Sequence, residues 1–322
     1  MQVVIYKMYA LRNSSLWLYA LAVLVVTVSL CASDASAQKR KQAATASAKT
    51  ITVRTEPNAI VWIDEVRRGT TDAEGRLAIK NVSSGRRVLR VRAGGFKETS
   101  MTLAPAQRGE VSVRLVRTTD EAELLFQQAE AAREKARDEE ARRVAAELYR
   151  STLKLRPRFA AANVGLARVL LELNDYNGAL AEIDAAYAAR PVYPEASAVE
   201  GRILRAAADE AAAIEAFKRA INDAKGFQPE AHTGLAMLYE DKGQYEESAA
   251  EFRKAIAQLS DTEPVIYQLL GAVYEKLEKY KEAVAAYEKY LELAPDGSLA
   301  PAIRSVMDQL RQQAEGRGGL PY

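Results

Sequence analysis

Residues 267–295 read YQLLGAVYEKLEKYKEAVAAYEKYLELAP, and this stretch decides the fold of the larger part of the chain. Its apolar residues recur at three- and four-residue spacing, which predicts amphipathic helices. Small residues at Gly271 and Ala283 let two helices approach closely, and large residues such as Tyr274 and Tyr287 fill the gap between them. Pro295 ends the second helix because it lacks the amide that the next turn needs. The stretch therefore predicts a helical hairpin.

The same hairpin pattern recurs along the chain at steps of 34 or 35 residues. Small residues hold the first register at Ala145, Ala179, Ala213, Ser248 and Ala283. Large apolar residues hold the second at Tyr149, Ile183, Phe217, Phe252 and Tyr287. A fixed period of this length is typical of stacked helical repeats. The predicted units cover 126–159, 160–193, 194–228, 229–263 and 264–297, with a capping helix over 298–315 and a tail over 316–322.

The fifth unit, with Leu270, Gly271, Tyr274, Ala283 and Pro295 in place, resembles the tetratricopeptide repeat. The resemblance implies an all-α solenoid over 120–315. It also implies that the inner helices form a concave surface, where this family usually binds peptides or protein surfaces. The lysine and asparagine set of relatives that bind chaperone tails does not assemble here.

Projection of the first helix of each unit identifies residues that lie off the packing stripe. The candidate partner-binding residues from this projection are Arg168, Arg202, Arg205, Met237 and Gln268. The three arginines would form a basic strip, and a guanidinium group binds a carboxylate through two parallel hydrogen bonds. We expect the strip to bind a carboxylate of a protein or peptide partner. The alternative for each residue is a solvated charge on an exposed helix face.

Residues 50–117 have a different pattern, in which apolar and polar residues alternate. Ile51 and Val53 alternate with Thr52 and Arg54, and turn signals such as the one at 72–75 separate the runs. Short alternating runs between turns predict a small antiparallel β-sandwich. The chain is therefore expected to be a multidomain protein, with a small all-β sandwich followed by an all-α solenoid.

Part of this region resembles a known family. Residues 55–64, TEPNAIVWID, together with 69–71 and 88–96, resemble the PEGA domain of bacterial envelope proteins. Asn58 and Glu65 stand where that family usually has glycine. Residues 69–77, GTTDAEGRL, also resemble the carboxypeptidase regulatory-type domain. Both resemblances imply a β-sandwich without catalysis.

Charge divides the chain into two regions. Residues 50–117 carry 13 Lys and Arg against 7 Asp and Glu, a net charge of +6. Residues 118–322 carry 26 against 35, a net charge of −9. This asymmetry indicates two units with different partners, or two units that contact each other.

One basic cluster lies in the β-region, made of Arg86, Arg87, Arg90 and Arg92. Such a cluster would hold an anionic wall polymer or a membrane surface. The alternative is a solvated strand face. The aromatic residues that interleave with basic ones in nucleic-acid platforms are missing, and the whole chain has a net charge of only +2, so no nucleic-acid partner is expected.

The first 37 residues predict a secretory signal. A short basic segment precedes an apolar run over 16–31, and the small residues Ala35 and Ala37 provide a cleavage site. The 16-residue run is shorter than the ~20 residues that a bilayer span needs. We therefore expect cleavage after Ala37 and a location in the periplasm or cell envelope. The residues that follow, 38–49, predict a flexible basic linker.

Two alternatives for this leader remain open. The apolar run would be an uncleaved anchor if the signal is retained, and only then is a membrane contact expected. A lipoprotein signal with Cys31 acylated is the other alternative, although Leu30 stands where a small residue is usual.

The sequence offers no catalyst. His232 is the only histidine and Cys31 the only cysteine, which excludes a histidine-based triad and a multi-histidine metal site within one chain. We expect His232 to be a half-buried core residue. Acidic pairs such as Glu246 and Glu247 are typical of solvated helices. We therefore predict no enzyme activity, no catalytic residue, no metal and no cofactor.

These observations give two hypotheses of function. The first is a non-enzymatic scaffold or adaptor of the bacterial cell envelope that binds a protein or peptide partner on the helical array. The second is an envelope-surface binder, in which the basic β-domain holds an anionic glycan or a membrane surface.

Overall fold

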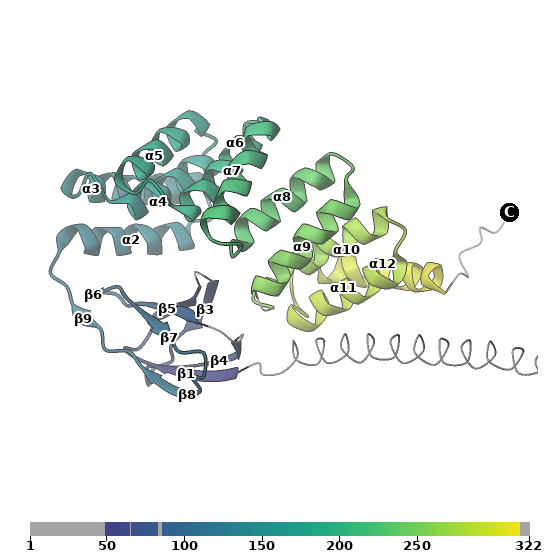
Figure 1. Ribbon diagram of the computed structural model, residues 1–322, viewed down its shortest axis with the longest axis horizontal. Coiled ribbons are helices and arrows are strands. Elements are labelled where there is room, and N and C mark those ends of the chain that lie inside the picture. Colours follow the sequence, from purple (N-terminus) through teal and green to yellow (C-terminus); the bar gives the residue numbers. More distant parts are fainter. Residues whose placement is uncertain (1–48, 65, 83–85, 260, 316–322) are drawn as a thin grey trace, which may run out of the picture.

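The computed structural model describes residues 49–64, 66–82, 86–259 and 261–315. The predicted leader, the predicted tail and all of the predicted linker except Lys49 lie outside the described residues. A β-sandwich is followed by a curved array of helices (Figure 1). The predicted fold class, a small all-β unit before an all-α solenoid, is confirmed.

The β-sandwich consists of two main sheets and one small ribbon. Its strands are β1 (Lys49–Arg54), β2 (Ile60–Ile63), β3 (Val66–Thr70), β4 (Arg76–Val82), β5 (Arg87–Arg92), β6 (Phe96–Lys97), β7 (Thr99–Leu103), β8 (Gly109–Ser112) and β9 (Val116–Arg117). One sheet has the order β4-β1-β8, the second has the order β3-β2-β5-β7, and β6 pairs with β9. The pairing of β1 with β8 is parallel, and the other pairs are antiparallel.

Alternation along the strands builds the core of the sandwich. Leu89 and Val91 of β5 are fully buried against Val61 and Ile63 of β2 and against the facing sheet. Arg90 and Arg92, which alternate with them along β5, therefore lie on the opposite face of the sheet, because side chains alternate along a strand. One face of the four-stranded sheet is thus apolar core, and the other is rich in arginine.

The described part of the chain contains eleven helices. They are α2 (Glu121–Lys135), α3 (Glu139–Leu155), α4 (Ala160–Glu172), α5 (Tyr176–Ala189), α6 (Pro194–Ala206), α7 (Glu210–Asp223), α8 (Pro229–Asp241), α9 (Tyr245–Leu259), α10 (Val265–Lys276), α11 (Tyr280–Leu293) and α12 (Ala300–Ala314). They form five pairs, from α2 and α3 to α10 and α11, and α12 packs on the last pair.

Local sequence sets where the helices begin. Asp138, Asp175 and Asp209 cap the second helices α3, α5 and α7, because each carboxylate accepts a hydrogen bond from a free amide of the first turn. The first helices α6 and α8 begin with Pro194 and Pro229, residues that fit the first turn of a helix without loss of a hydrogen bond.

Large aromatic rings fill the space beside small residues in the array. Phe217 of α7 packs against Gly201 of α6 and Gly234 of α8, and its side chain is fully buried. Tyr287 of α11 packs in the same way on Gly271 of α10. Phe217 therefore joins helices within its pair and between neighbouring pairs, and Tyr287 joins the two helices of the last pair.

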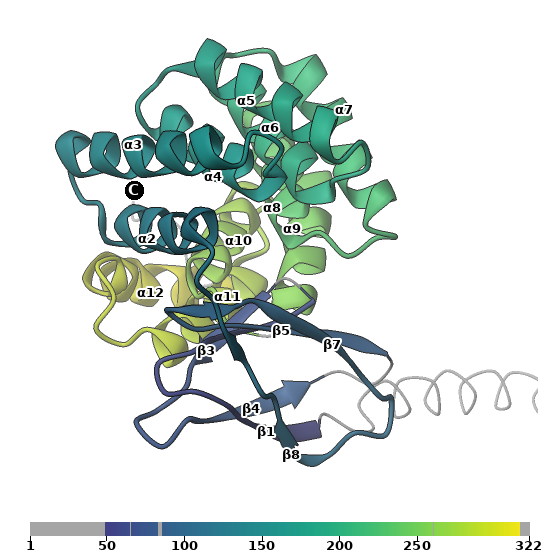
Figure 2. The ribbon, with the colours of Figure 1, turned by 90° about the vertical axis from the view of Figure 1, so that its left-hand side faces the viewer.

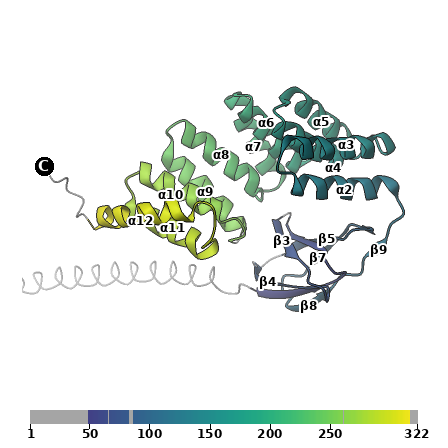
Figure 3. The ribbon, with the colours of Figure 1, turned by 180° about the vertical axis from the view of Figure 1, so that it is seen from behind.

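The sandwich lies against the inner side of the array. Figures 2 and 3 show the sheet that contains β3, β5 and β7 nearer to the helices, and the sheet that contains β1, β4 and β8 farther away. Helix α2 runs directly above the sandwich (Figure 1). None of the helices in the described part of the chain combines the length and the apolar character needed to cross a bilayer.

Candidate functional site

A cleft of about 930 Å³ lies between the sandwich and the array. One wall is the outer face of the four-stranded sheet, with Trp62, Val88 and Arg90. The other wall is the inner side of the helices. Its larger apolar and aromatic lining residues are Phe126, Phe159, Tyr193, Phe227, Leu259 and Ile266. The cleft thus joins residues that are up to 204 positions apart in the chain, from Trp62 to Ile266.

Polar contacts along helix α2 hold the sandwich against the array. Arg67 of β3 donates to Glu134 at 3.0 Å, and Arg92 of β5 donates to Glu130 at 3.3 Å. The Gln127 side chain accepts from the Gly95 amide at 3.0 Å and donates to the Phe96 carbonyl at 2.7 Å. These bonds join the basic unit to the acidic one, which is one of the two possibilities that the charge asymmetry left open.

A second contact zone lies on the other side of the cleft. Arg68 of β3 donates to the main-chain carbonyl of Leu259 at 3.2 Å, where α9 ends. The sandwich therefore touches the first helix of the array and the end of its eighth, and it bridges the curve between them.

Arg92 is the most enclosed side chain of the first contact zone. Its guanidinium carbon lies 5.3 Å from the Trp62 ring centre and 4.9 Å from the Phe126 ring centre, one ring from each unit. Its side chain is 10% exposed and also pairs with Glu98 at 2.8 Å. Burial alone would lower its pKa, but Glu98 and Glu130 outweigh burial and raise it.

Glu130 of α2 is the residue of the array that pairs with Arg92. Burial alone would raise its pKa, but Arg133, Arg92 and a hydrogen bond from the Tyr149 hydroxyl outweigh burial and hold the pKa below its ordinary value. Glu130 therefore stays ionised and links the sandwich to the aromatic core of the first helix pair.

The predicted basic cluster is largely paired within the chain. Arg87 pairs with Asp64 at 3.1 Å, and Arg90 pairs with Glu98 at 3.4 Å while its guanidinium carbon lies 4.3 Å from the Trp62 ring centre. Arg92 is buried in the contact with the array, and Arg86 is exposed. The four arginines therefore do not form one free basic surface, and their role toward an anionic polymer stays a prediction.

Two of the arginines that we predicted on the concave surface also form ion pairs with glutamates of the chain itself. Arg168 of α4 binds both carboxylate oxygens of Glu230 of α8 at 2.7 Å, and it lies 3.5 Å from Glu195. Arg202 of α6 donates to Glu230 at 3.0 Å. The two-pronged bond expected with a partner carboxylate is thus made with a carboxylate of the chain itself.

Strong electrostatic coupling keeps this cluster charged. Burial alone would raise the pKa of Glu230, but the neighbouring Arg168 and Arg202 outweigh burial and lower it to about 2. The same pairing raises the pKa of Arg168 against the effect of burial. A partner carboxylate would have to displace Glu230 to reach Arg168.

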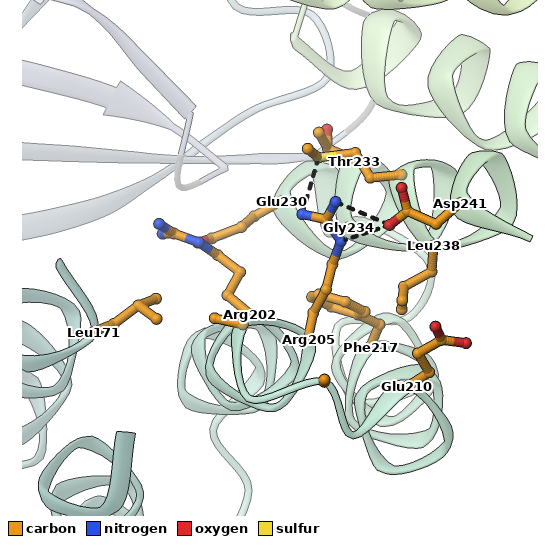
Figure 4. A pocket seen from close by; sticks show the side chains of 13 residues that line it. Leu171, Arg202, Arg205, Glu210, Phe217, Glu230, Thr233, Gly234, Leu238 and Asp241 are labelled. Carbon is orange, nitrogen blue, oxygen red and sulfur yellow. Dashed lines mark hydrogen bonds and ion pairs between the residues drawn. The ribbon is translucent and has the colours of Figure 1, made fainter. Parts of the chain in front are cut away.

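A second cavity, of about 630 Å³, lies among α6, α7 and α8 (Figure 4). Arg205 lines this cavity and donates to Asp241 at 3.0 Å, and it also lies 3.8 Å from the Met237 sulfur. Phe217 and Leu238 form part of the apolar lining. Gln268 of α10 is half-buried and lines neither of these two cavities.

His232 lies in the array core and not in either cavity. Its Nδ1 is 2.6 Å from Glu251 and its Nε2 is 3.3 Å from the Gly226 carbonyl. At 5% exposure it is more buried than the half-buried residue we expected. Within the described residues, no group of three or more His, Cys, Asp and Glu side chains is placed to hold a metal ion.

Sequence reasoning missed the carboxylates and the aromatic residue that complete these sites. Glu195 and Glu230 each follow a proline at the start of a first helix, 35 residues apart, and that repetition was the available signal. Nothing in the sequence indicated that Trp62 belongs to this site, because only the docking of the sandwich brings it to the array.

Comparisons with known proteins agree with the repeat pattern. Residues 136–203 and 228–296 match two models of the tetratricopeptide repeat. A comparison with curated proteins finds no match.

Solved structures give a further comparison. PilW, a type IV pilus biogenesis factor, is 15% identical with a TM-score of 0.50, over 63% of this chain and 96% of that one. A TPR protein of Thermus thermophilus is 22% identical with a TM-score of 0.49, over 59% and 98% of the two chains. YrrB, a TPR protein with an unusual peptide-binding site, is 19% identical with a TM-score of 0.40, over 58% and 94%. At these identities the likeness concerns the fold alone.

Proposed function

We propose that this chain, whose helical region carries tetratricopeptide repeats, is a non-enzymatic protein-interaction scaffold. In this proposal the cleft between the sandwich and the array binds an extended segment of a partner protein. The observation that carries the proposal is the cleft itself. Its volume of about 930 Å³ lies within the range of ligand pockets, and it is lined by aromatic and apolar side chains between charged ones.

Both units would contribute to binding. Val88 on the sheet is 43% exposed and faces the cleft, whereas most apolar residues of the sandwich are buried. On the array, Phe227 and Ile266 line the opposite wall. An extended segment placed between these walls would bury apolar surface on two sides, which is the main source of stable association.

The cell envelope is the proposed location. It follows from the signal-like residues 1–37, which lie outside the described residues, and from the resemblance of 50–117 to the PEGA domain. The alternative, a basic β-domain that holds an anionic glycan or membrane, has less support, because three of its four arginines are paired within the chain.

A selection of random displayed peptides on the full chain tests the proposal. Selected peptides are then titrated against the unmodified chain and against Val88→Glu, which places a charge in the cleft. The matched control is Val144→Glu, the same change at a 51% exposed position of α3 outside the cleft. We expect Val88→Glu to weaken binding about tenfold, which corresponds to ~1.4 kcal/mol, and the control to leave it unchanged. Equal binding by both variants would contradict the cleft as the site.

A further inference from the structure

The contact between the two units is almost entirely polar. In the described residues the buried core of the sandwich contains only sandwich residues, and the buried clusters of the array contain only array residues. The two units are joined by hydrogen bonds, ion pairs and the stacking of Arg92 on Phe126. Separation of the units would therefore break mainly polar contacts, and the apolar surface that it uncovers at the Arg92 contact is the Phe126 ring.

The covalent link between the units is also short and simple. The Thr118 amide donates to the Gly95 carbonyl at 3.0 Å, so Thr118 still belongs to the sandwich. Asp120 already belongs to the array, because its carboxylate caps the first turn of α2 and pairs with Arg156. The chain therefore passes from one unit to the other at Thr119.

The sandwich forms one wall of the cleft, covers the array wall opposite, and contacts the array on both sides of the curve. Arg67, Arg92 and the backbone near Gly95 touch helix α2, and Arg68 touches the carbonyl of Leu259. A partner segment that belongs to a folded protein has to pass this cover to reach the array wall.

We infer that the β-sandwich is a hinged lid over the cleft, which turns about residues 118–120 and is latched in the closed position by its polar contacts with α2. This inference rests on the proposed function, because the partner segment proposed there is what the lid would admit and enclose. The central element of the latch is Arg92, which pairs with Glu98 on its own unit and with Glu130 on the array. Arg67 and Glu134 form its outer, more exposed element.

The latch has a predicted dependence on salt. The Arg67 and Glu134 side chains are 45% and 35% exposed, so salt screens their attraction. At about 1 M salt the Debye length falls to about 3 Å, and exposed pairs then contribute little. The Arg92 pair is more buried and is screened less. Salt alone should therefore loosen the lid partly, and loss of both arginines should loosen it further.

Distance measurement by electron spin resonance tests the lid without any partner. Spin labels are placed on the full chain at Glu74→Cys in the sandwich and Lys281→Cys in α11, both exposed positions, with Cys31→Ser removing the native thiol. A second pair, Val144→Cys and Lys281→Cys, reports on the array alone. Each pair is measured at low and at high salt.

The variants separate the latch from general charge effects. Arg67→Gln with Arg92→Gln removes both latch arginines, and Arg54→Gln removes an exposed ion pair within the sandwich as the matched control. We expect one narrow distance for the sandwich-to-array pair in the unmodified chain at low salt. In the double variant we expect the narrow distance between the two labels to be replaced by a spread of longer distances. In the unmodified chain at high salt we expect the same change to a smaller extent.

Two results would overturn the inference. One is the same narrow distance in the double variant and at high salt, which would show a fixed joint. The other is an equally broad distance distribution for the label pair within the array, which would show that the array moves and not the sandwich. Neither result depends on peptide binding, so the lid and the proposed function fail or stand separately.

Discussion

Arg168 of α4 and Glu230 of α8 form a two-pronged ion pair, with both N–O distances at 2.7 Å, across 62 residues of sequence. The pair skips one repeat, and Arg202 from the repeat between them joins it at 3.0 Å. The centre of the concave face is therefore occupied by the chain's own charges. This ties three consecutive helix pairs together, and Arg168 and Glu230 also line the cleft beside the sandwich, among its apolar and aromatic residues.

The first prediction concerns the stability of this ion pair. Glu230→Gln should lower the free energy of unfolding by about 3 kcal/mol at neutral pH, because it leaves Arg168, only 16% exposed, with only the longer ion pair to Glu195. Urea unfolding followed by circular dichroism measures the change. Glu215→Gln, which removes a 72% exposed carboxylate from a surface pair, is the control and should cost less than about 0.5 kcal/mol.

The same pair predicts a response to acid. The pKa of Glu230 is about 2 in the folded chain, below the usual value near 4.3 for an unfolded one. Its stabilising contribution is therefore complete above about pH 4.3 and is lost as the pH falls toward 2. Glu230→Gln should remove this part of the acid dependence of the unfolding free energy. An acid dependence identical to that of the unmodified chain would contradict the assignment.

A second prediction tests the packing of the repeat. A methyl group added at Gly271 would lie 2.6 Å from the Tyr287 ring, closer than atoms pack, so Gly271→Ala should destabilise the array by roughly 1–3 kcal/mol. Gly94→Ala is the control, because a methyl group there meets no atom within 4 Å. Thermal unfolding of both variants gives the comparison, and equal midpoints would contradict the packing described.

A third prediction concerns the only histidine. His232→Phe keeps an aromatic ring in the core but removes the bonds to Glu251 and to the Gly226 carbonyl. We expect a loss of about 2 kcal/mol in the free energy of unfolding, since Glu251, whose side chain is only 13% exposed, then loses its most buried partner. Lys254→Gln removes the other, 55% exposed partner of Glu251 and should cost less than about 0.5 kcal/mol. An unchanged free energy of unfolding in His232→Phe would show that His232 contributes only by packing.

The helical fold was predictable because its signals are local and repeated. The recurrence of small and aromatic residues around Ala213 and Phe217 reflects contacts within one pair and its neighbour, so each unit carries the whole pattern. Alternation along Ile51 and Val53 likewise predicted the sandwich, since these residues form its core. The resemblance of this sandwich to the PEGA domain stays a prediction.

The site was predictable only in part, because its contacts join distant repeats. Helical projection selected Arg168 and Arg202, and the structure shows that Arg168 lines the cleft and Arg202 the second cavity. The projection gave no information on Glu230, which reaches Arg168 only because the array curves. Trp62 and Arg92 reach the cleft only because the sandwich docks on α2, and net charge predicted that contact but not its residues.

The most direct test of the central claim is hydrogen exchange on the full chain, with and without a peptide selected on it. Binding in the cleft predicts slower exchange on both walls, in β2 and β5 of the sheet and at the start of α6, α8 and α10. The outer helices α3 and α5 should exchange at unchanged rates. Protection confined to the outer helices, or to the sandwich alone, would contradict a binding site built from both units.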